Sequence, residues 1–325
     1  MTTPTPDLKT LIRRLEKRHQ KKQAATALIA GTAVLGLTVL VAPLFGQKEV
    51  APVAVEPTPI AAPASDAFEE VRLEGKAAIV YDLVTGETLY EKNSRSQLPL
   101  ASLTKLLTVY AAAESIDANA TITMSDTALL SEGESGFSAG ESFAFGDLAR
   151  LALVSSSNDA TAAIAETAAI AQATTGKNML ASAATALGLA QTYALNGTGL
   201  DESTSVSGGY GSAKDIATLS GKLLQIAPEI ANATVNTSIS IRSREGVLHT
   251  LPNTNPGISR IPNALLSKTG FTDLAGGNLA VVYDASIGHP IAIVVLGSSR
   301  DGRFTDVNVL MNRTDEYFAG LNDQR

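Results

Sequence analysis

The amino-acid sequence predicts an α/β protein of the α+β type, in which a central five-stranded antiparallel sheet is covered by terminal helices and carries a large all-helical insert. Three observations lead to this class. Two strand-like segments precede a long stretch of helical tendency, and three strand-like segments follow it. The connections within each group are short, and short connections join antiparallel neighbours. An amphipathic helix near the end of the chain can cover one sheet face.

The strands can be placed from their alternating and apolar patterns. The first hairpin is expected over residues 77–82 and 88–90, which flank the turn-forming residues 84–87. The insert is expected over about residues 116–237, where alanine- and leucine-rich periodic stretches alternate with polar loops. The three later strands and the final helix are expected at residues 264–269, 278–283, 291–296 and 304–321.

Composition excludes several kinds of site. The chain has 325 residues and no cysteine, which rules out disulfides, thiol nucleophiles and thiolate metal sites. Seven of its 25 basic residues and two of its 32 acidic residues fall within the first 23 positions, so the remainder carries 18 basic against 30 acidic residues. A surface this acidic argues against nucleic-acid binding. The sequence shows no phosphate-binding glycine loop and no clustered metal-ligand spacing, so neither a metal nor a cofactor is expected.

The N-terminal segment predicts a membrane anchor. Residues 1–23 are polar and basic, and residues 24–45 form an uncharged run long enough to cross a bilayer as a helix. An uncleaved signal-anchor is favoured over a cleaved signal peptide, whose apolar core is usually shorter. Basic residues before the span place the N-terminus in the cytoplasm and the remaining chain outside. Residues 46–66 are rich in alanine, valine and proline and predict an extended linker to a domain over residues 67–325.

A serine and a lysine on one predicted helix are the first candidates for chemistry. Apolar residues recur at helical spacing after Pro99, which suits the start of a helix. Residues three apart share a helix face, so the Ser102 hydroxyl and the Lys105 amine become neighbours. A hydroxyl is a weak nucleophile until a base takes its proton, and a buried lysine with a lowered pKa can be that base.

Two further polar motifs follow in the chain. Ser156 and Asn158 interrupt a helical region and can relay a proton and orient a substrate amide, although this pattern alone also fits a helix cap or a loop. At the end of an apolar strand, Lys268 and Thr269 offer a charge and a hydroxyl to a carboxylate, and Gly270 would let a ligand approach the backbone. Because the second motif belongs to the insert and the third to the sheet, the site would be a cleft between two lobes.

The three motifs occur in the order S-x-x-K, S-x-N and K-T-G, which is the signature of penicillin-interacting serine enzymes. From about residue 77 to residue 313, the sequence resembles a low-molecular-mass penicillin-binding protein of the serine D-alanyl-D-alanine carboxypeptidase family. That family belongs to the β-lactamase/transpeptidase-like superfamily, whose fold the resemblance therefore implies. The likeness extends beyond the motifs to residues 100–105, 155–160, 197–201, 212–217 and 268–272.

The resemblance implies a hydrolase of peptidoglycan biosynthesis, acting in cell-wall biogenesis and cell shape on the extracytoplasmic side of the bacterial cell membrane. Its substrates would be stem peptides ending in D-Ala-D-Ala, and β-lactam antibiotics would acylate the same serine. Ser102 would attack the penultimate carbonyl and expel the terminal D-Ala, with Lys105 as the general base, and water would then hydrolyse the acyl-enzyme. Ser156 and Asn158 would handle proton transfer and the substrate amide.

The resemblance also assigns the substrate-binding residues. They are Lys268, Thr269, Gly270, Phe271 and Thr272. Lys268 and Thr269 would bind the terminal carboxylate, with Thr272 as a helper, and the backbone N–H groups of Ser102 and Phe271 would form the oxyanion hole. Two ammonium groups facing one cleft oppose each other's protonation, and this favours the neutral amine that a base requires.

Two features depart from the family pattern. Phe271 follows the K-T-G motif where some relatives carry histidine, so an imidazole-dependent substrate preference does not carry over. The C-terminal membrane-binding extension usual in the family is not expected, since the chain ends soon after its last helix. The N-terminal span would replace that anchor.

A different hydrolase fold is the first alternative. Ser138, flanked by Gly136 and Gly140, matches the G-x-S-x-G elbow of α/β-hydrolases, and His249 or His289 could complete a triad. That elbow requires a preceding strand, whereas polar residues come before this one, and the repeating strand–helix pattern is missing.

Three further alternatives share or retain the motif residues. A β-lactamase needs a glutamate-positioned water, and the one glutamate between residues 160 and 200, Glu166, lies in an apolar helical run. A D,D-endopeptidase that cuts peptidoglycan cross-links uses the same machinery and is the closest alternative. A catalytically silent, membrane-tethered wall-binding module would leave the motif residues dispensable.

Overall fold

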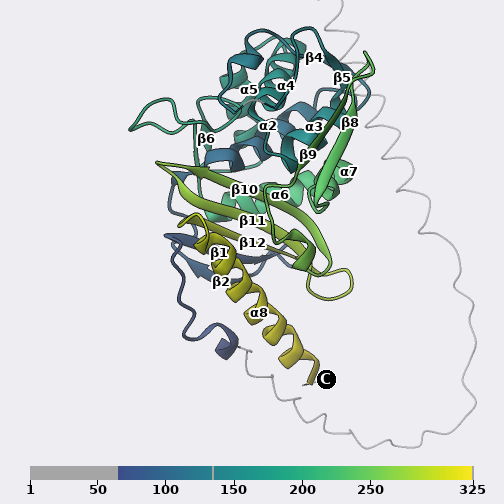
Figure 1. The fold of residues 1–325 in the computed structure, drawn as a ribbon. Helices are drawn as coiled ribbons and strands as arrows, with labels where there is room; N and C mark the ends of the chain where they lie inside the picture. Colours follow the sequence, from purple (N-terminus) through teal and green to yellow (C-terminus); the bar gives the residue numbers. More distant parts are fainter. Residues whose placement is uncertain (1–64, 134, 324–325) are drawn as a thin grey trace, which may run out of the picture. The chain divides into compact units, whose positions relative to one another are not determined.

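The five long strands form one antiparallel sheet in the order β10-β11-β12-β1-β2 (Figure 1). This order is seen in a computed structural model that describes residues 65–133 and 135–323. The insert leaves the sheet after the edge strand β2 and returns at the opposite edge strand, β10. The predicted arrangement, two strands before the insert and three after it, is confirmed. The strand bounds are β1 (Ala77–Asp82), β2 (Thr88–Lys92), β10 (Ala264–Thr272), β11 (Gly276–Asp284) and β12 (Pro290–Ser298).

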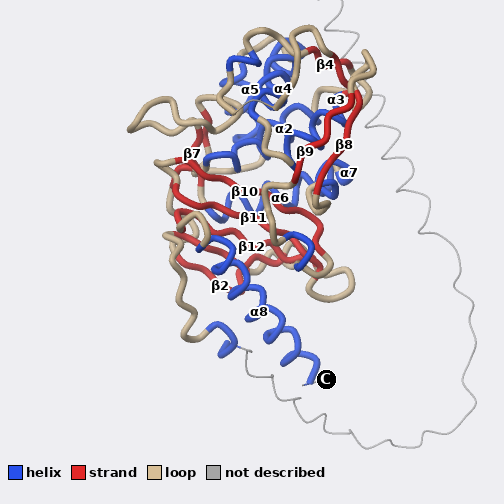
Figure 2. The backbone as a smooth tube through the Cα atoms, in the orientation of Figure 1, coloured by secondary structure: helices blue, strands red, loops and turns tan. Residues whose placement is uncertain are grey.

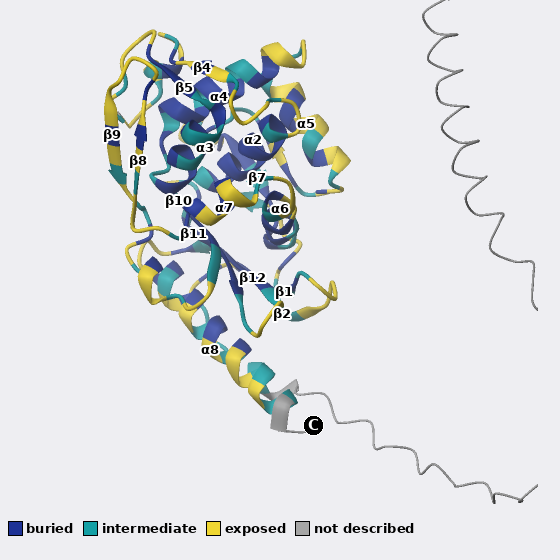
Figure 3. Cartoon of the chain, turned by 90° about the vertical axis from the view of Figure 1, so that its right-hand side faces the viewer, coloured by how far each residue is buried: buried dark blue, intermediate teal, exposed yellow. Residues whose placement is uncertain are grey.

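Different parts of the chain cover the two faces of the sheet (Figure 2). Alternate residues of a strand point to opposite faces, so Val80 packs beneath α8 (Gly302–Asp323) while its neighbour Ile79 packs against the insert. Leu310 anchors α8, and Figure 3 shows that helix buried toward the sheet and exposed on its outer side. Within the described residues, the N-terminal contribution to this face is one 3-10 turn, η1 (Ser65–Phe68).

The lobe on the other face is built around α2, the helix that carries Lys105. Nearly every residue of α2 is buried, because α3, α4, α5 and α6 pack around it. A helix with apolar residues on most of its surface favours such a central position. The helices of this lobe are α2 (Thr104–Ala113), α3 (Phe145–Val154), α4 (Asn158–Ala171), α5 (Gly176–Ala186), α6 (Ala213–Ile226) and α7 (Pro228–Ala233).

The insert is not all-helical, which corrects the prediction. Strand β4 pairs with β5, and β7 lies between β6 and β3 (Leu98–Pro99). Strands of two or three residues are too short to show an alternating pattern, and they form because partners distant in the chain complete their hydrogen bonds. Among the described residues of this range, the short strands are β4 (Thr121–Thr123), β5 (Ser142–Ala144), β6 (Tyr193–Ala194) and β7 (Gly209–Gly211).

Pro99 does not start a helix, contrary to the sequence expectation. It lies in β3 and pairs with Tyr210 of β7. The helical geometry begins only beyond this pairing, in the 3-10 turn η2 (Ala101–Leu103), which continues directly into α2. The serine of the first motif therefore lies at a junction between a strand and a helix.

The predicted cytoplasmic segment, transmembrane helix and nearly all of the linker, residues 1–23, 24–45 and 46–66, lie outside the described residues. Among the helices that are described, none combines the length and the apolar character needed to cross a membrane. The described residues all belong to one compact unit of the chain.

Candidate active site

The turn that carries Ser102 is enclosed by backbone on two sides. Ser102 is half-buried in η2, and Ala101 before it has a φ of 48°. At Gly199, whose φ is 77°, an added Cβ would lie 2.0 Å from the Ala101 carbonyl oxygen. At Gly270 it would lie 2.9 Å from the Leu100 carbonyl oxygen. The absence of a side chain at Gly270 thus makes room for the Ser102 turn. The sequence had suggested that this room would serve the approach of a ligand.

The Lys105 amine is fully buried and reaches three oxygen atoms. Its Nζ lies 2.8 Å from Ser102 Oγ, 2.6 Å from Asn158 Oδ1 and 2.7 Å from the Thr198 carbonyl oxygen. Burial lowers the pKa of Lys105 to about 7. A neutral amine donates two hydrogen bonds and accepts one, so Lys105 can donate to Asn158 and Thr198 and accept the Ser102 proton. The predicted serine–lysine contact is confirmed.

The turn between α3 and α4 brings the second motif to both lysines. Asn158 is the first residue of α4, and Ser157 caps that helix by accepting a hydrogen bond of 3.1 Å from the Ala160 N–H. Ser156, in the turn, has a φ of 61°. Its Oγ accepts a hydrogen bond of 2.8 Å from Lys268 Nζ. The motif therefore caps a helix and also lines the site.

Lys268 lies inside β10, not at a strand end as expected, because the pairing with β11 continues to Thr272. Its side chain is 1% exposed, and Nζ also donates to the Thr269 carbonyl oxygen at 2.8 Å. Burial is the largest cause of its lowered pKa, and the positive charges of Lys105 and Arg303 add to it. Both amines are thus biased toward the neutral form.

The side chains that follow Lys268 make contacts that the sequence does not predict. Thr269 Oγ1 lies 2.7 Å from Thr254 Oγ1, and Thr272 Oγ1 donates to Asp201 Oδ1 at 3.1 Å. The Arg300 guanidinium lies over the Phe271 ring, 4.0 Å from its centre. One face of the Phe271 ring, next to the K-T-G motif, is therefore covered by the guanidinium of Arg300.

Two side chains that the sequence does not predict, those of Arg303 and Asn196, hold backbone groups of the site in place by hydrogen bonds. Arg303, at the start of α8, donates a hydrogen bond of 2.6 Å to the Gly270 carbonyl oxygen. The Thr198 carbonyl faces Lys105 because Asn196 Oδ1 accepts hydrogen bonds from the Thr198 and Gly199 N–H groups. Glycines beside Thr198 signal an unusual backbone there, whereas nothing in the sequence around Arg303 distinguishes it from a helical surface arginine.

The rival nucleophile lacks the partners it would need. No strand precedes Ser138 in the described residues of its loop. His249 Nε2 lies 2.7 Å from Glu141 Oε1, and His289 Nε2 lies 2.5 Å from Asp82 Oδ2. A carboxylate partner is compatible with a triad, but within the described residues neither imidazole is hydrogen-bonded to the Ser138 hydroxyl, so the contact between nucleophile and base is missing.

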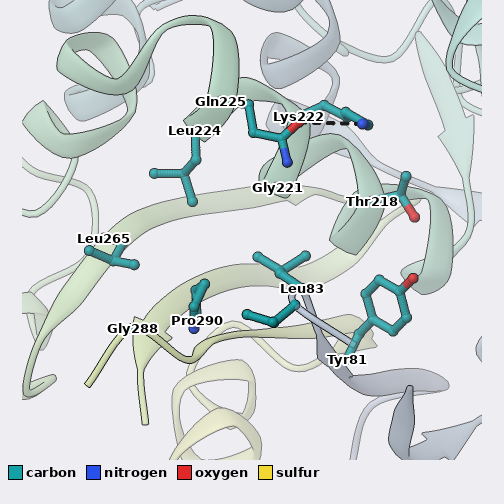
Figure 4. Close-up of a pocket in the computed structure, with 11 residues that line it drawn as sticks. Tyr81, Leu83, Thr218, Gly221, Lys222, Leu224, Gln225, Leu265, Gly288 and Pro290 are labelled. Carbon is teal, nitrogen blue, oxygen red and sulfur yellow. Dashed lines mark hydrogen bonds between the residues drawn. The ribbon is translucent and has the colours of Figure 1, made fainter. Parts of the chain in front are cut away.

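A groove of about 560 Å³ borders β10 just beyond the K-T-G motif. Phe271, Thr272, Asp201 and Glu132 are among the residues that line it. Figure 4 shows a second pocket, between α6, β1 and residues that include Leu83 and Leu265. Its volume is about 490 Å³, and none of the predicted site residues lines it.

Across the part of the chain that the structure describes, no group of three or more histidine, aspartate or glutamate side chains could hold a metal ion.

The arrangement can perform nucleophilic catalysis on a substrate with a negative charge. Ser102 has a base within hydrogen-bond distance. A second amine, Lys268, is hydrogen-bonded to Ser156, two residues before the Asn158 that contacts Lys105. A base in contact with a hydroxyl is the requirement for a serine nucleophile, and a lysine beside hydroxyl groups suits an anionic substrate group.

Sequence comparisons point to one family. The family described as D-alanyl-D-alanine carboxypeptidase matches residues 63–300. The D-alanyl-D-alanine carboxypeptidase DacF of Bacillus subtilis is 32% identical over 238 residues, which are 71% of this chain and 59% of that protein. A D-alanyl-D-alanine endopeptidase of Pseudomonas aeruginosa is 30% identical over 243 residues, which are 72% of this chain and 74% of that protein.

A comparison with solved structures gives a relative whose fold matches most of this chain. Penicillin-binding protein D2 from Listeria monocytogenes, solved in its ampicillin-bound form, superposes with a TM-score of 0.64 at 26% sequence identity. The match covers 75% of this chain and 98% of that one. The shared part therefore includes nearly all of the solved structure.

The close approach at Gly199 predicts a large cost for one added methyl group. Replacement Gly199→Ala should lower the free energy of unfolding, measured by urea denaturation, by about 3 kcal/mol or more, because Cβ would overlap the Ala101 carbonyl. Gly140→Ala is the matched control, since its φ of 80° is similar but nothing lies within 4 Å of the added Cβ. That variant should lose only about 1 kcal/mol. Equal losses in the two variants would show that the Ser102 turn is not tightly enclosed.

Proposed function

We propose that this chain, which belongs to the D-alanyl-D-alanine carboxypeptidase family, removes the terminal D-Ala from peptidoglycan stem pentapeptides through an acyl-enzyme on Ser102. One observation carries the proposal: a buried amine with a pKa near 7 lies 2.8 Å from the Ser102 hydroxyl. The match to DacF spans 59% of that relative's length, so the activity in its name reaches this chain only as part of the proposal.

In the acylation step, Lys105 takes the Ser102 proton as Oγ attacks the penultimate carbonyl carbon. The new C–O bond forms, the peptide C–N bond breaks, and the proton is delivered to the departing D-Ala amine. Ser156 is suited to that delivery because its hydroxyl is hydrogen-bonded to the Lys268 amine, a second group that can exchange a proton. Water then hydrolyses the ester and returns Ser102 to its starting form.

The oxyanion hole is assigned to the backbone N–H groups of Ser102 and Phe271. Support comes from the approach of β10 to the Ser102 turn, where an added Cβ at Gly270 would lie 3.3 Å from the Ser102 nitrogen. This packing brings the strand that carries Phe271 next to the nucleophile. Arg303 holds the same strand through the Gly270 carbonyl. Fixed N–H donors of this kind stabilise negative charge that develops during attack.

The terminal carboxylate of the substrate is assigned to Lys268 and Thr269, with Thr272 as a helper. An arriving carboxylate favours the protonated form of Lys268 and so counteracts the burial that lowers its pKa. Asn158 orients the substrate amide while its Oδ1 remains on Lys105. The groove that Phe271 lines beyond the motif gives the rest of the stem peptide a place to lie.

Cleavage of cross-links is a second candidate, because a relative of 30% identity is named an endopeptidase. The two reactions differ in the amine that is expelled when the acyl-enzyme forms, D-Ala or a second stem peptide, and not in the nucleophile. A β-lactamase is less well supported. Glu166 accepts a hydrogen bond of 2.6 Å from Ser125 and lies eight residues, or about 12 Å of helix, beyond Asn158, too far to position water at Ser102.

β-Lactam antibiotics are proposed as inhibitors that acylate Ser102. The ampicillin-bound state of the Listeria relative supports this assignment, because that protein shares the fold. A β-lactam presents a strained amide and a nearby carboxylate, which match the roles given to Ser102 and Lys268.

The proposed location is the bacterial cell membrane, with a single span over residues 24–45, residues 1–23 in the cytoplasm and the peptidase domain on the extracytoplasmic side. The basic and uncharged pattern of these segments supports it. The substrate class also agrees, since peptidoglycan lies outside the membrane.

The full chain, purified in detergent, should release D-Ala from a stem pentapeptide and become labelled by a fluorescent penicillin. Ser102→Ala should abolish labelling and lower D-Ala release by about a thousandfold or more, because no other hydroxyl contacts the Lys105 amine in the described network. Ser138→Ala is the control and should retain both activities. Labelling that survives in Ser102→Ala would refute the nucleophile assignment. Cleavage of a cross-linked dimer into its two stem peptides, without D-Ala release from the pentapeptide, would favour the endopeptidase.

The pKa of Lys105 predicts the pH dependence of acylation. Below a pKa of about 7 the amine is protonated and cannot take the Ser102 proton, so the rate of penicillin acylation should rise with pH and level off above 8. The rate at pH 6 should be about tenfold below that plateau. Lys105→Met should be slow at every pH. A wild-type profile that is flat from pH 5 to pH 9 would contradict the role of Lys105.

A further inference from the structure

Thr254 is in direct contact with the proposed carboxylate-binding residue Thr269. The two hydroxyl oxygens lie 2.7 Å apart, and Thr269 is 4% exposed. Thr254 follows the hairpin of β8 (Ser238–Arg242) and β9 (Leu248–Pro252), which no motif marks. Either hydroxyl of the pair could be the donor, so the direction of the Thr269 proton depends on Thr254.

The segment around Thr254 is held on both sides. Its N–H donates to the Val154 carbonyl oxygen at 3.2 Å, at the end of α3 just before the Ser156 turn. The next residue, Asn255, donates from Nδ2 to Ser267 Oγ at 2.9 Å, on β10 just before Lys268. Thr254 therefore spans the second and third motifs, and its hydroxyl is set in place by two anchors that involve no substrate.

A threonine hydroxyl has one proton to give. If Thr269 donated to Thr254, it would have none for a carboxylate. If Thr254 donates instead, the Thr269 oxygen is satisfied and its proton is free to point into the site. Only the second arrangement allows Thr269 to act as the substrate-binding group that the proposed function needs.

We infer that Thr254 is a positioning residue for carboxylate recognition: its hydroxyl donates to Thr269 Oγ1 and directs the Thr269 proton at the free carboxylate of the substrate or of a β-lactam. This inference rests on the proposed function for the role of Thr269, and it adds a residue outside all three motifs. Lys268 supplies charge, which acts in any direction, whereas the Thr254–Thr269 pair supplies a directed hydrogen bond.

The test compares two probes that differ only in the carboxylate, benzylpenicillin and its methyl ester, by the second-order rate of acylation of the full chain. Thr254→Val removes the hydroxyl with little change of shape, and it should slow acylation by benzylpenicillin about tenfold while the rate with the ester stays within about twofold. Thr254→Ser keeps a hydroxyl and should restore the preference for the acid. Thr250→Val, on β9, is the matched control, because it also removes a threonine hydroxyl, one that pairs with Ser240 instead.

A purely structural role for Thr254 would slow both probes equally, and that result would overturn the inference, as would an unchanged acid-to-ester ratio. Thr254→Ala, a smaller side chain at the same position, provides the same comparison if Thr254→Val does not fold. Failure of the proposed carboxypeptidase activity has a separate signature, the absence of D-Ala release by the wild-type chain, and it leaves the comparison of the two penicillin probes readable.

Discussion

The site depends on one interaction, the contact between the Ser102 hydroxyl and an amine that the fold keeps out of water. A lysine in water carries a proton near neutral pH and cannot act as a base. Burial at the centre of the helical lobe removes the solvation that stabilises the ammonium ion, and contacts with three oxygen atoms fix the position of the amine. The chemistry of Lys105 therefore follows from where α2 lies, which in turn follows from the apolar residues that make up most of that helix.

The rest of the structure serves to bring three distant segments to that amine. The sheet places β10 against the Ser102 turn, and glycines at 199 and 270 permit the close approach of backbone that this requires. The turn between α3 and α4 supplies Ser156 to Lys268 and Asn158 to Lys105, so one short segment joins the two amines. A cost in backbone strain at Ser156, whose φ is 61°, accompanies this arrangement.

Much of this architecture could be predicted from the sequence, because long elements and spaced motifs leave strong local signals. The five long strands, the final helix and the contact between Ser102 and Lys105 all follow from periodicity and spacing. The short strands of the insert and the position of Pro99 could not be predicted, since they depend on pairing between segments far apart in the chain. The partners Thr254 and Arg303 were missed for the same reason: neither residue differs locally from any surface threonine or arginine.

The proposed chemistry requires that about half or more of the Lys105 amine be neutral near physiological pH. An NMR titration of the full chain labelled with ¹⁵N in its lysine side chains measures this directly, with the Lys105 signal assigned by its loss in Lys105→Met. A titration midpoint near pH 7 is the expected result. A midpoint near the ordinary lysine value of 10.5 would show that the amine stays protonated beside Ser102, and would contradict its role as the base.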